Sequence, residues 1–84
     1  MYSIEVVEHA EKFFKKILKE DAEIISNKIY SLRENPFRFL KRLKGYKLWR
    51  LRILKYRVII DAVVSGNRII ILKIGYIKNI YDEI

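Results

Sequence analysis

Basic side chains are concentrated in one segment of the chain, residues 33–57. This segment holds ten Lys or Arg and a single acid, Glu34, and it accounts for all of the formal net charge of +8 at pH 7. Lys and Arg bind phosphate groups and neutralise the negative charge that develops on them during reaction. The segment therefore predicts a site for a polyanion or an acidic partner. Its bases are Arg33, Arg38, Lys41, Arg42, Lys44, Lys47, Arg50, Arg52, Lys55 and Arg57.

Length and composition predict one small domain over residues 1–84. Fifteen isoleucines suit a core packed on a sheet. The chain lacks cysteine, and His9 is its only histidine, so we expect no disulfide, no metal site and no cofactor. The N-terminus lacks a signal-peptide pattern, and the longest apolar run, Ile69–Leu72, is far too short for a membrane span. We expect a soluble, cytoplasmic protein.

Two amphipathic helices are expected in the first half of the chain. Apolar residues recur at helical spacing from Ala10 to Leu18, which predicts a helix over about residues 8–20. Asp21 is placed to cap a second helix. This helix should end one residue before Pro36, because proline disfavours helix in the residue that precedes it. The tight connection predicts an antiparallel helical hairpin.

Strands are expected on both sides of these helices. The hydrophobic period changes from 3.6 to 2 after Pro36, and Ser65-Gly66-Asn67 is a strong turn signal. The expected strands are residues 2–7, 49–53, 56–64 and 69–74. The order β-α-α-β-β-β predicts an α+β fold, in which the helical hairpin packs on one face of a twisted, mainly antiparallel four-stranded sheet.

The register of the strands predicts a cluster of arginines. A hairpin centred on Leu54-Lys55 places Arg52 opposite Arg57, with Arg50 on the same face. Two-residue turns favour Gly, Asn or Asp, so a three-residue loop that breaks this pairing stays open. A three-residue loop at residues 65–67 would add Lys73 to the same face.

Apolar residues are expected beside the arginines. Lys73 would then lie opposite Ile59, and Ile59, Ile69 and Ile71 would form an exposed patch that a partner covers. The alternative is that the segment around Ile80 folds back over them.

The residues from Asn35-Pro36 through Leu43-Lys44-Gly45 to Trp49-Arg50-Leu51-Arg52 and Tyr56-Arg57-Val58 resemble the RelE/ParE toxin superfamily. Its Gly-His-Arg-x-x-Val-Tyr ending is similar to residues 75–81, although Tyr76-Ile77 replaces the His-Arg. The resemblance covers nearly the whole chain and implies a RelE-like type II toxin. The resemblance implies an archaeal member, and high Ile and Lys content favours a thermophilic source, although nucleotide bias gives the same counts.

The resemblance implies metal-independent cleavage of mRNA in the ribosomal A site, or gyrase inhibition in ParE-type members. It also implies a cognate RelB-like antitoxin, which is acidic and wraps the toxin, and no small-molecule cofactor. By position, Arg57 falls on a phosphate-binding arginine, Arg50 and Arg52 on the preceding basic strand, and Tyr81 on a tyrosine that orients the RNA. Lys78 follows the missing His-Arg, but on an extended strand it would point to the opposite face.

Cleavage of RNA by its own 2′-hydroxyl needs a proton acceptor, cations for the phosphorane, and a proton donor for the leaving 5′-oxygen. We expect the three arginines to hold the phosphate. Tyr81 would position the RNA or help to deprotonate the 2′-hydroxyl, and Lys78 or Lys73 would donate the proton to the leaving oxygen. A dense basic cluster favours both roles, because it lowers the pKa of a lysine and favours a phenolate. Non-specific phosphate contacts are expected from Lys41, Arg42, Lys44 and Lys47, with Lys73 as a further RNA contact.

Simpler interpretations remain open for these residues. Arg50 and Arg52 could form a solvated strand face, and Tyr81 could be a packing residue. Arg57 could pair with Asp61, Asp82 or Glu83. For the whole chain, the alternatives are a gyrase inhibitor, a catalytically weakened family member, and a non-toxic basic RNA-binding module.

Overall fold

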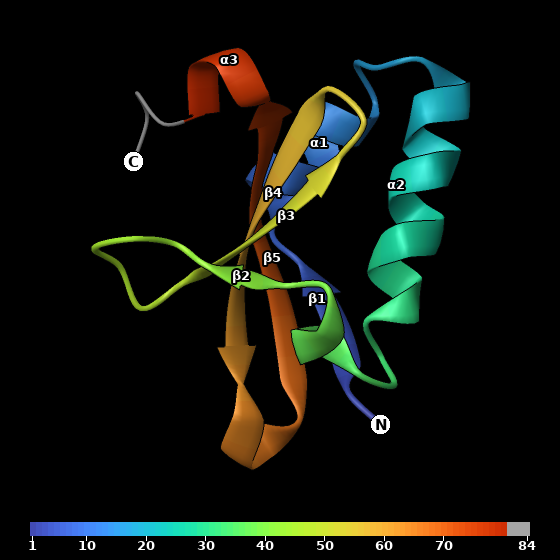
Figure 1. Cartoon of the computed structure of the whole chain (residues 1–84). Helices are drawn as coiled ribbons and strands as arrows, with labels where there is room; N and C mark the ends of the chain where they lie inside the picture. The colour runs from blue at the N-terminus through green and yellow to red at the C-terminus, as the bar shows by residue number, and fades with distance from the viewer. Residues whose placement is uncertain (81–84) are drawn as a thin grey trace.

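The computed structural model describes residues 1–80 and shows an α+β domain with a mixed five-stranded sheet. The sheet order is β1-β5-β4-β3-β2, with β1 parallel to β5 and the other pairs antiparallel. Figure 1 shows α2 beside the sheet and α1 behind it. The elements are β1 (Ser3–Val6), α1 (Glu8–Phe14), α2 (Lys19–Ser31), a 3-10 turn (Pro36–Arg38), β2 (Lys41–Arg42), β3 (Trp49–Ile53), β4 (Tyr56–Val63), a 3-10 turn (Val64–Gly66), β5 (Arg68–Tyr76) and α3 (Ile77–Ile80).

The predicted helical hairpin is present, with different boundaries. α1 ends at Phe14 rather than near residue 20, and Leu18 is the N-cap of α2 and is exposed. The expected cap at Asp21 is wrong, because this residue already lies in the first turn of α2. Its carboxylate instead accepts a hydrogen bond of 2.6 Å from the Tyr56 hydroxyl of β4.

The main core lies between the two helices and one face of the sheet. Ala10 of α1, together with Ile25 and Ile29 of α2, packs against the isoleucines and valine of β4 and β5. Apolar stripes at helical spacing bury one side of each helix, and this burial is the main favourable contribution to the fold. The opposite face of the sheet is therefore the one on which polar side chains can gather.

The β3–β4 hairpin has the predicted two-residue turn. Ile53 pairs with Tyr56, and Arg52 pairs with Arg57, so the register expected from the sequence is confirmed. Leu54, which is not a typical residue for such a turn, adopts a left-handed conformation with φ of 54°. Tertiary packing of the two strands holds the turn in spite of this conformational cost.

The β4–β5 ladder contains one pair that the sequence predicted, although the connection that produces it differs from the expected one. Lys73 does lie opposite Ile59, but the loop between Val63 and Arg68 has four residues rather than three. A bulge at Leu72 supplies the compensating shift, since Ile60 pairs with Ile71 and Ile59 pairs with Lys73.

The same bulge makes the expected apolar patch wrong. Ile69 and Ile71 are fully buried in the main core, on the helical face of the sheet. Beyond the bulge the alternation is offset by one residue, so Ile74 rather than Lys73 continues the core face. Ile59 does lie on the other face, but it is only 3% exposed.

Ile59 belongs to a second, small apolar cluster. Leu43 is buried with it, and Leu48 and Leu72 pack against the pair. Residues 43–48 form a loop closed by hydrogen bonds from Leu43 N–H to the Leu48 carbonyl (2.9 Å) and from Tyr46 N–H to the Leu43 carbonyl (3.1 Å). The preceding residues, expected to be loop, form β2, which is why the sheet has five strands rather than four.

Candidate functional site: a basic sheet face

Two cross-strand rows of residues place the predicted arginines on one face of the sheet. In the first row, Lys41 of β2 lies opposite Arg50 of β3, and Arg50 lies opposite Ile59 of β4, which lies opposite Lys73 of β5. In the second row, Arg52 lies opposite Arg57, and Arg57 lies opposite Gly75. We call Arg50, Arg52, Arg57, Lys41 and Lys73 the basic face.

Arg57 is the central member of the basic face. Its side chain is only 5% exposed, and among residues 1–80 it is the one charged side chain that is buried. Burial lowers the pKa of the Arg57 guanidinium, and the neighbouring charges of Arg50 and then Arg52 lower it further. A positive charge held away from water beside two others attracts an anion more strongly than an exposed arginine does.

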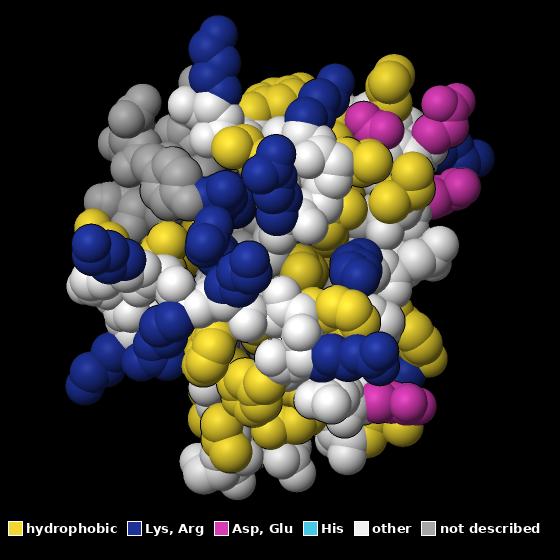
Figure 2. Space-filling view, viewed as in Figure 1, with side chains coloured by type: hydrophobic (Ala, Val, Ile, Leu, Met, Phe, Trp, Pro, Cys, Tyr) yellow, Lys and Arg dark blue, Asp and Glu magenta, His cyan; other side chains and the backbone are white. Residues whose placement is uncertain are grey.

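The other predicted cations differ in exposure and in position relative to Arg57. Arg50 is half-buried, whereas Arg52 is exposed and lies at the end of β3 beside the hairpin turn. Lys44 and Lys47 are exposed in the 43–48 loop. Arg42 lies on the other, helical face of the sheet, because it pairs with Trp49, which pairs with buried Ile60; its guanidinium stacks over the Trp49 ring at 5.0 Å. In Figure 2, Lys and Arg side chains gather over the β2–β3 side of the molecule, away from the acidic side chains near α2.

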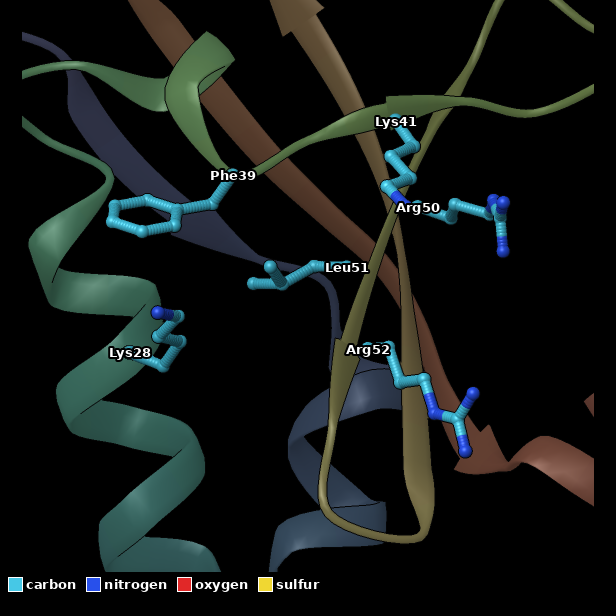
Figure 3. Close-up of a pocket in the computed structure, with 6 residues that line it drawn as sticks. All are labelled: Lys28, Phe39, Lys41, Arg50, Leu51 and Arg52. Carbon is cyan, nitrogen blue, oxygen red and sulfur yellow. The ribbon is translucent and has the colours of Figure 1, made fainter.

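A second feature, which the sequence did not indicate, lies along the edge of β3. A pocket of about 380 Å³ is lined by Lys28, Phe39, Lys41, Arg50, Leu51 and Arg52. Figure 3 shows Leu51, Lys28 and Phe39 on the α2 side of β3, whereas the Arg50 and Arg52 side chains extend to the opposite side. The Lys28 amine lies 3.8 Å from the centre of the Phe39 ring. Because β2 pairs with only the first two residues of β3, the rest of this edge borders the pocket.

The C-terminal candidates and the expected acidic partners of Arg57 lie in different parts of the chain. Tyr81 lies outside the described residues, as do Asp82 and Glu83, two of the expected partners of Arg57. Lys78 is in the short helix α3 rather than on an extended strand, and with Arg52 it lines a second hollow at the hairpin turn. The third expected partner, Asp61, lies opposite Ile70 of β5. The pKa of Arg68 is raised mainly by its hydrogen bond to Glu5, with a smaller contribution from the charge of Asp61.

Tyr76 and Ile77 occupy the positions of the missing His-Arg. Tyr76 pairs with Tyr56 and packs against Phe13 on the helical side of the sheet. The Tyr76 ring therefore lies on the helical side, away from the basic face. Within residues 1–80, no group of His, Asp and Glu side chains is arranged to hold a metal ion, and no helix is long and apolar enough to cross a bilayer.

Comparison with solved structures identifies the fold. A chain of the RelBE2 toxin–antitoxin complex from Mycobacterium tuberculosis matches with a TM-score of 0.80 and 17% identity, over 89% of this chain and 96% of that one. The archaeal RelE–RelB complex from Pyrococcus horikoshii matches with a TM-score of 0.79 and 23% identity, over 89% and 93%. This chain has the RelE fold. The isolated RelE toxin of E. coli matches with a TM-score of 0.77 and 18% identity, over 99% and 94%.

Sequence comparisons add nothing to the structural match, since no protein-family model and no curated protein sequence matches the chain. Coverage of 89–99% of this chain and 93–96% of the matched chains shows that the likeness extends over most of the domain. At these identities the likeness concerns the fold, so the chemistry of the site depends on this chain's own residues.

Proposed function

We propose that this chain is the toxin of a type II toxin–antitoxin system, and that it cleaves mRNA in the ribosomal A site without a metal ion. The observation that carries the proposal is the juxtaposition of Arg50, Arg52 and buried Arg57 on one face of a RelE fold. The similar structures are RelBE toxin–antitoxin complexes and the isolated RelE toxin, which supports the same role here.

The arginines supply the electrostatic part of the reaction. When the 2′-oxygen attacks the adjacent phosphorus, the phosphorane carries one more negative charge than the phosphate diester. Arg57 is held in place by burial, while Arg50 and Arg52 reach the same face from β3. Fixed cations at this position stabilise the transition state more than the ground state, and removing one such donor typically lowers a rate by about 10²–10³.

Proton transfers complete the proposed reaction. The phenolate form of Tyr81 accepts the proton of the 2′-hydroxyl and becomes the neutral phenol, and a protonated lysine gives its proton to the leaving 5′-oxygen. The products are a 2′,3′-cyclic phosphate and a free 5′-hydroxyl. Lys73 is the first candidate for this proton donor, because it lies in the same cross-strand row as Arg50. Lys78 is the second candidate, since it borders the same hollow as Arg52.

An acidic antitoxin is the partner that this surface favours. The exposed bases of residues 41–55 repel one another, and an acidic chain that covers them would relieve this repulsion. We infer a RelB-like antitoxin that blocks access of RNA to the basic face. Because the proposed substrate is mRNA on the ribosome, we expect the activity in the cytoplasm.

The deciding experiment is regulated expression in a sensitive host, with the ends of ribosome-bound mRNAs mapped. Wild type should arrest growth and leave mRNAs cut in the A site, whereas Arg57→Ala should do neither. Lys16→Ala, which removes an exposed lysine from the helical side, is the matched control and should behave as wild type. Uncut mRNA on expression of the wild-type chain, or undiminished cutting by Arg57→Ala, would refute the proposal.

A second candidate is a gyrase inhibitor or a catalytically weakened RelE-type protein. The observation that favours it is that Tyr76 and Ile77 occupy the positions of the RelE-type His-Arg. Tyr76 packs on Phe13 and Tyr56 instead of lying beside Arg57. This candidate predicts growth arrest with whole mRNA, and gyrase inhibition would appear as lost supercoiling. A non-toxic RNA-binding module would instead give salt-sensitive RNA binding and normal growth.

A further inference from the structure

The hollow at the turn between β3 and β4 is the feature that the proposed mechanism leaves unexplained. It measures about 590 Å³ and is lined by Arg52, Leu54, Lys55, Tyr76, Ile77 and Lys78. This size is within the usual range for ligand sites, roughly 300–1,000 Å³. Among residues 1–80, its lining combines three cations with apolar side chains and includes no carboxylate.

One wall of the hollow is an aromatic side chain in a fixed position. The Tyr76 ring lies 5.2 Å from the Tyr56 ring and 5.6 Å from the Phe13 ring, measured between ring centres. Tyr56 is in turn fixed by its hydrogen bond to Asp21. Tyr76 nevertheless remains 40% exposed, so its ring is held from behind and accessible from the hollow. A ring immobilised before binding loses little entropy when another ring stacks on it.

The rim of the hollow is positive and rigid. The Lys55 amine lies 5.7 Å from the centre of the Tyr56 ring and 5.9 Å from that of Tyr76. A hydrogen bond of 3.0 Å from the Ile77 N–H to the Lys55 carbonyl joins α3 to the turn. In Figure 2, basic side chains lie on either side of hydrophobic atoms over α3 and the β3–β4 turn.

The hollow is continuous with the basic face, because Arg52 belongs to both. Arg52 stands opposite Arg57 on the sheet and also lines the hollow. A single strand whose phosphate lies on Arg52 can therefore place a neighbouring base at Tyr76, which also lines the hollow. Stacking on an aromatic ring flanked by cations is the usual way in which proteins hold unpaired bases.

We propose that this hollow binds one unpaired nucleobase of single-stranded RNA, stacked on Tyr76, with the adjacent phosphates on Lys55 and Arg52. This inference rests on the proposed function, since it assigns a base subsite to the same RNA. It makes Tyr76 a residue that selects and orients the RNA strand. Tyr76, which replaces the histidine of the RelE-type His-Arg, then contributes to RNA binding from the side of β5 opposite to the basic face.

The test uses the full chain and a set of short single-stranded RNAs labelled at one end. Each RNA of the set lacks the base at one position, and fluorescence anisotropy at low salt gives its affinity. For wild type, loss of the base at one position should weaken binding about tenfold. Tyr76→Leu should bind the intact RNA about tenfold more weakly, and the same base loss should then cost nothing further.

Three control variants separate stacking from folding. Tyr76→Phe keeps the ring and should behave as wild type. Tyr30→Leu alters a more exposed tyrosine of α2, far along the chain from the hollow, and should also leave both affinities unchanged. Lys55→Glu changes an exposed side chain of the rim, and it should weaken binding of intact RNA even if Tyr76→Leu fails to fold.

The outcomes distinguish the subsite from the proposed function. If wild type binds RNA with the expected salt sensitivity but no single base matters, or if Tyr76→Leu keeps the full penalty for base loss, the subsite is refuted and the function stands. If wild type shows no affinity for RNA at any salt concentration, the subsite is overturned, whereas uncut mRNA in the expression experiment overturns the proposed function. A penalty that disappears only in Tyr76→Leu supports the subsite.

Discussion

The Tyr56 hydroxyl donates a 2.6 Å hydrogen bond to the Asp21 carboxylate and thereby ties the first turn of α2 to the start of β4. Tyr56 is 1% exposed, and its ring supports Tyr76. The bond therefore connects the helical layer to the end of the sheet where the basic face and the hollow meet. It also explains why Asp21 is an acidic residue without acting as a helix cap.

Replacing Tyr56 with Phe should lower the free energy of unfolding by about 1 kcal/mol at neutral pH. Burial, and secondly the bond to Asp21, raises the pKa of Tyr56 from 10.0 to about 12. The protonated form is thus favoured in the folded state, so its contribution is complete below pH 10 and is lost as the pH rises through about 12. Urea unfolding of both proteins across this range should show their stabilities converging. Parallel pH profiles would contradict the assignment.

Replacing Arg52 with Gln should raise stability by about 0.5 kcal/mol, because like charges directly opposite each other on a ladder are destabilising. Added salt screens this repulsion, so it should stabilise wild type more than the variant. The same change should lower RNA cleavage by about 10²–10³. Chemical denaturation in urea and a cleavage assay on the same preparations give both results. A variant that is less stable and still fully active would contradict the placement of Arg52 beside Arg57.

Leu54→Gly should stabilise the protein by about 0.5 kcal/mol. Leu54 has φ of 54°, a conformation that costs an L-residue about 1–2 kcal/mol, whereas glycine adopts it freely and loses about 0.5–1 kcal/mol to greater unfolded-state entropy. Gly45→Ala is the matched control at another left-handed position, with φ of 85° and open space around an added Cβ. It should destabilise by about 1 kcal/mol. Thermal unfolding should show shifts of opposite sign.

Leu43→Ala should lower the free energy of unfolding by about 2 kcal/mol, the low end for a buried leucine, because the cluster around Ile59 is small. The loss should be local. Hydrogen exchange should accelerate at residues 43–48, while the amides of α1 and the β4–β5 ladder stay protected. RNA affinity should fall as well, since the loop that presents Lys44 and Lys47 loses its anchor. Uniform acceleration throughout the chain would instead place Leu43 in the main core.

The sequence predicted the elements whose residues alternate clearly. The β3–β4 pairing followed from the alternation of Arg50, Leu51 and Arg52, because a one-residue slip would expose the whole apolar set. This register alone is sufficient to bring Arg52 and Arg57 together on one face. The two helices also followed from their apolar spacing, but their ends did not. Leu18 continues the apolar stripe of the first helix, yet it is the N-cap residue of α2.

Tertiary structure decided the features that depend on a single irregular residue. The bulge at Leu72 is invisible in a run of apolar residues, yet it moves Ile69 and Ile71 into the core and turns Lys73 to the basic face. β2 forms because Lys41 and Arg42 pair with residues of β3. The hollow at Tyr76 likewise needs the turn, α3 and two distant aromatic rings in one place.

The sequence by itself determined the charge of residues 33–57 and, from a period of 3.6, the two helical faces. It predicted the pairing of Arg52 with Arg57 from a period of 2, while its turn residues left a three-residue loop open. Only the tertiary structure decided how deeply Arg57 is buried, which face Lys73 and Tyr76 occupy, and what covers Ile59. These properties depend on long-range packing around a bulge, and no local pattern encodes the position of that bulge.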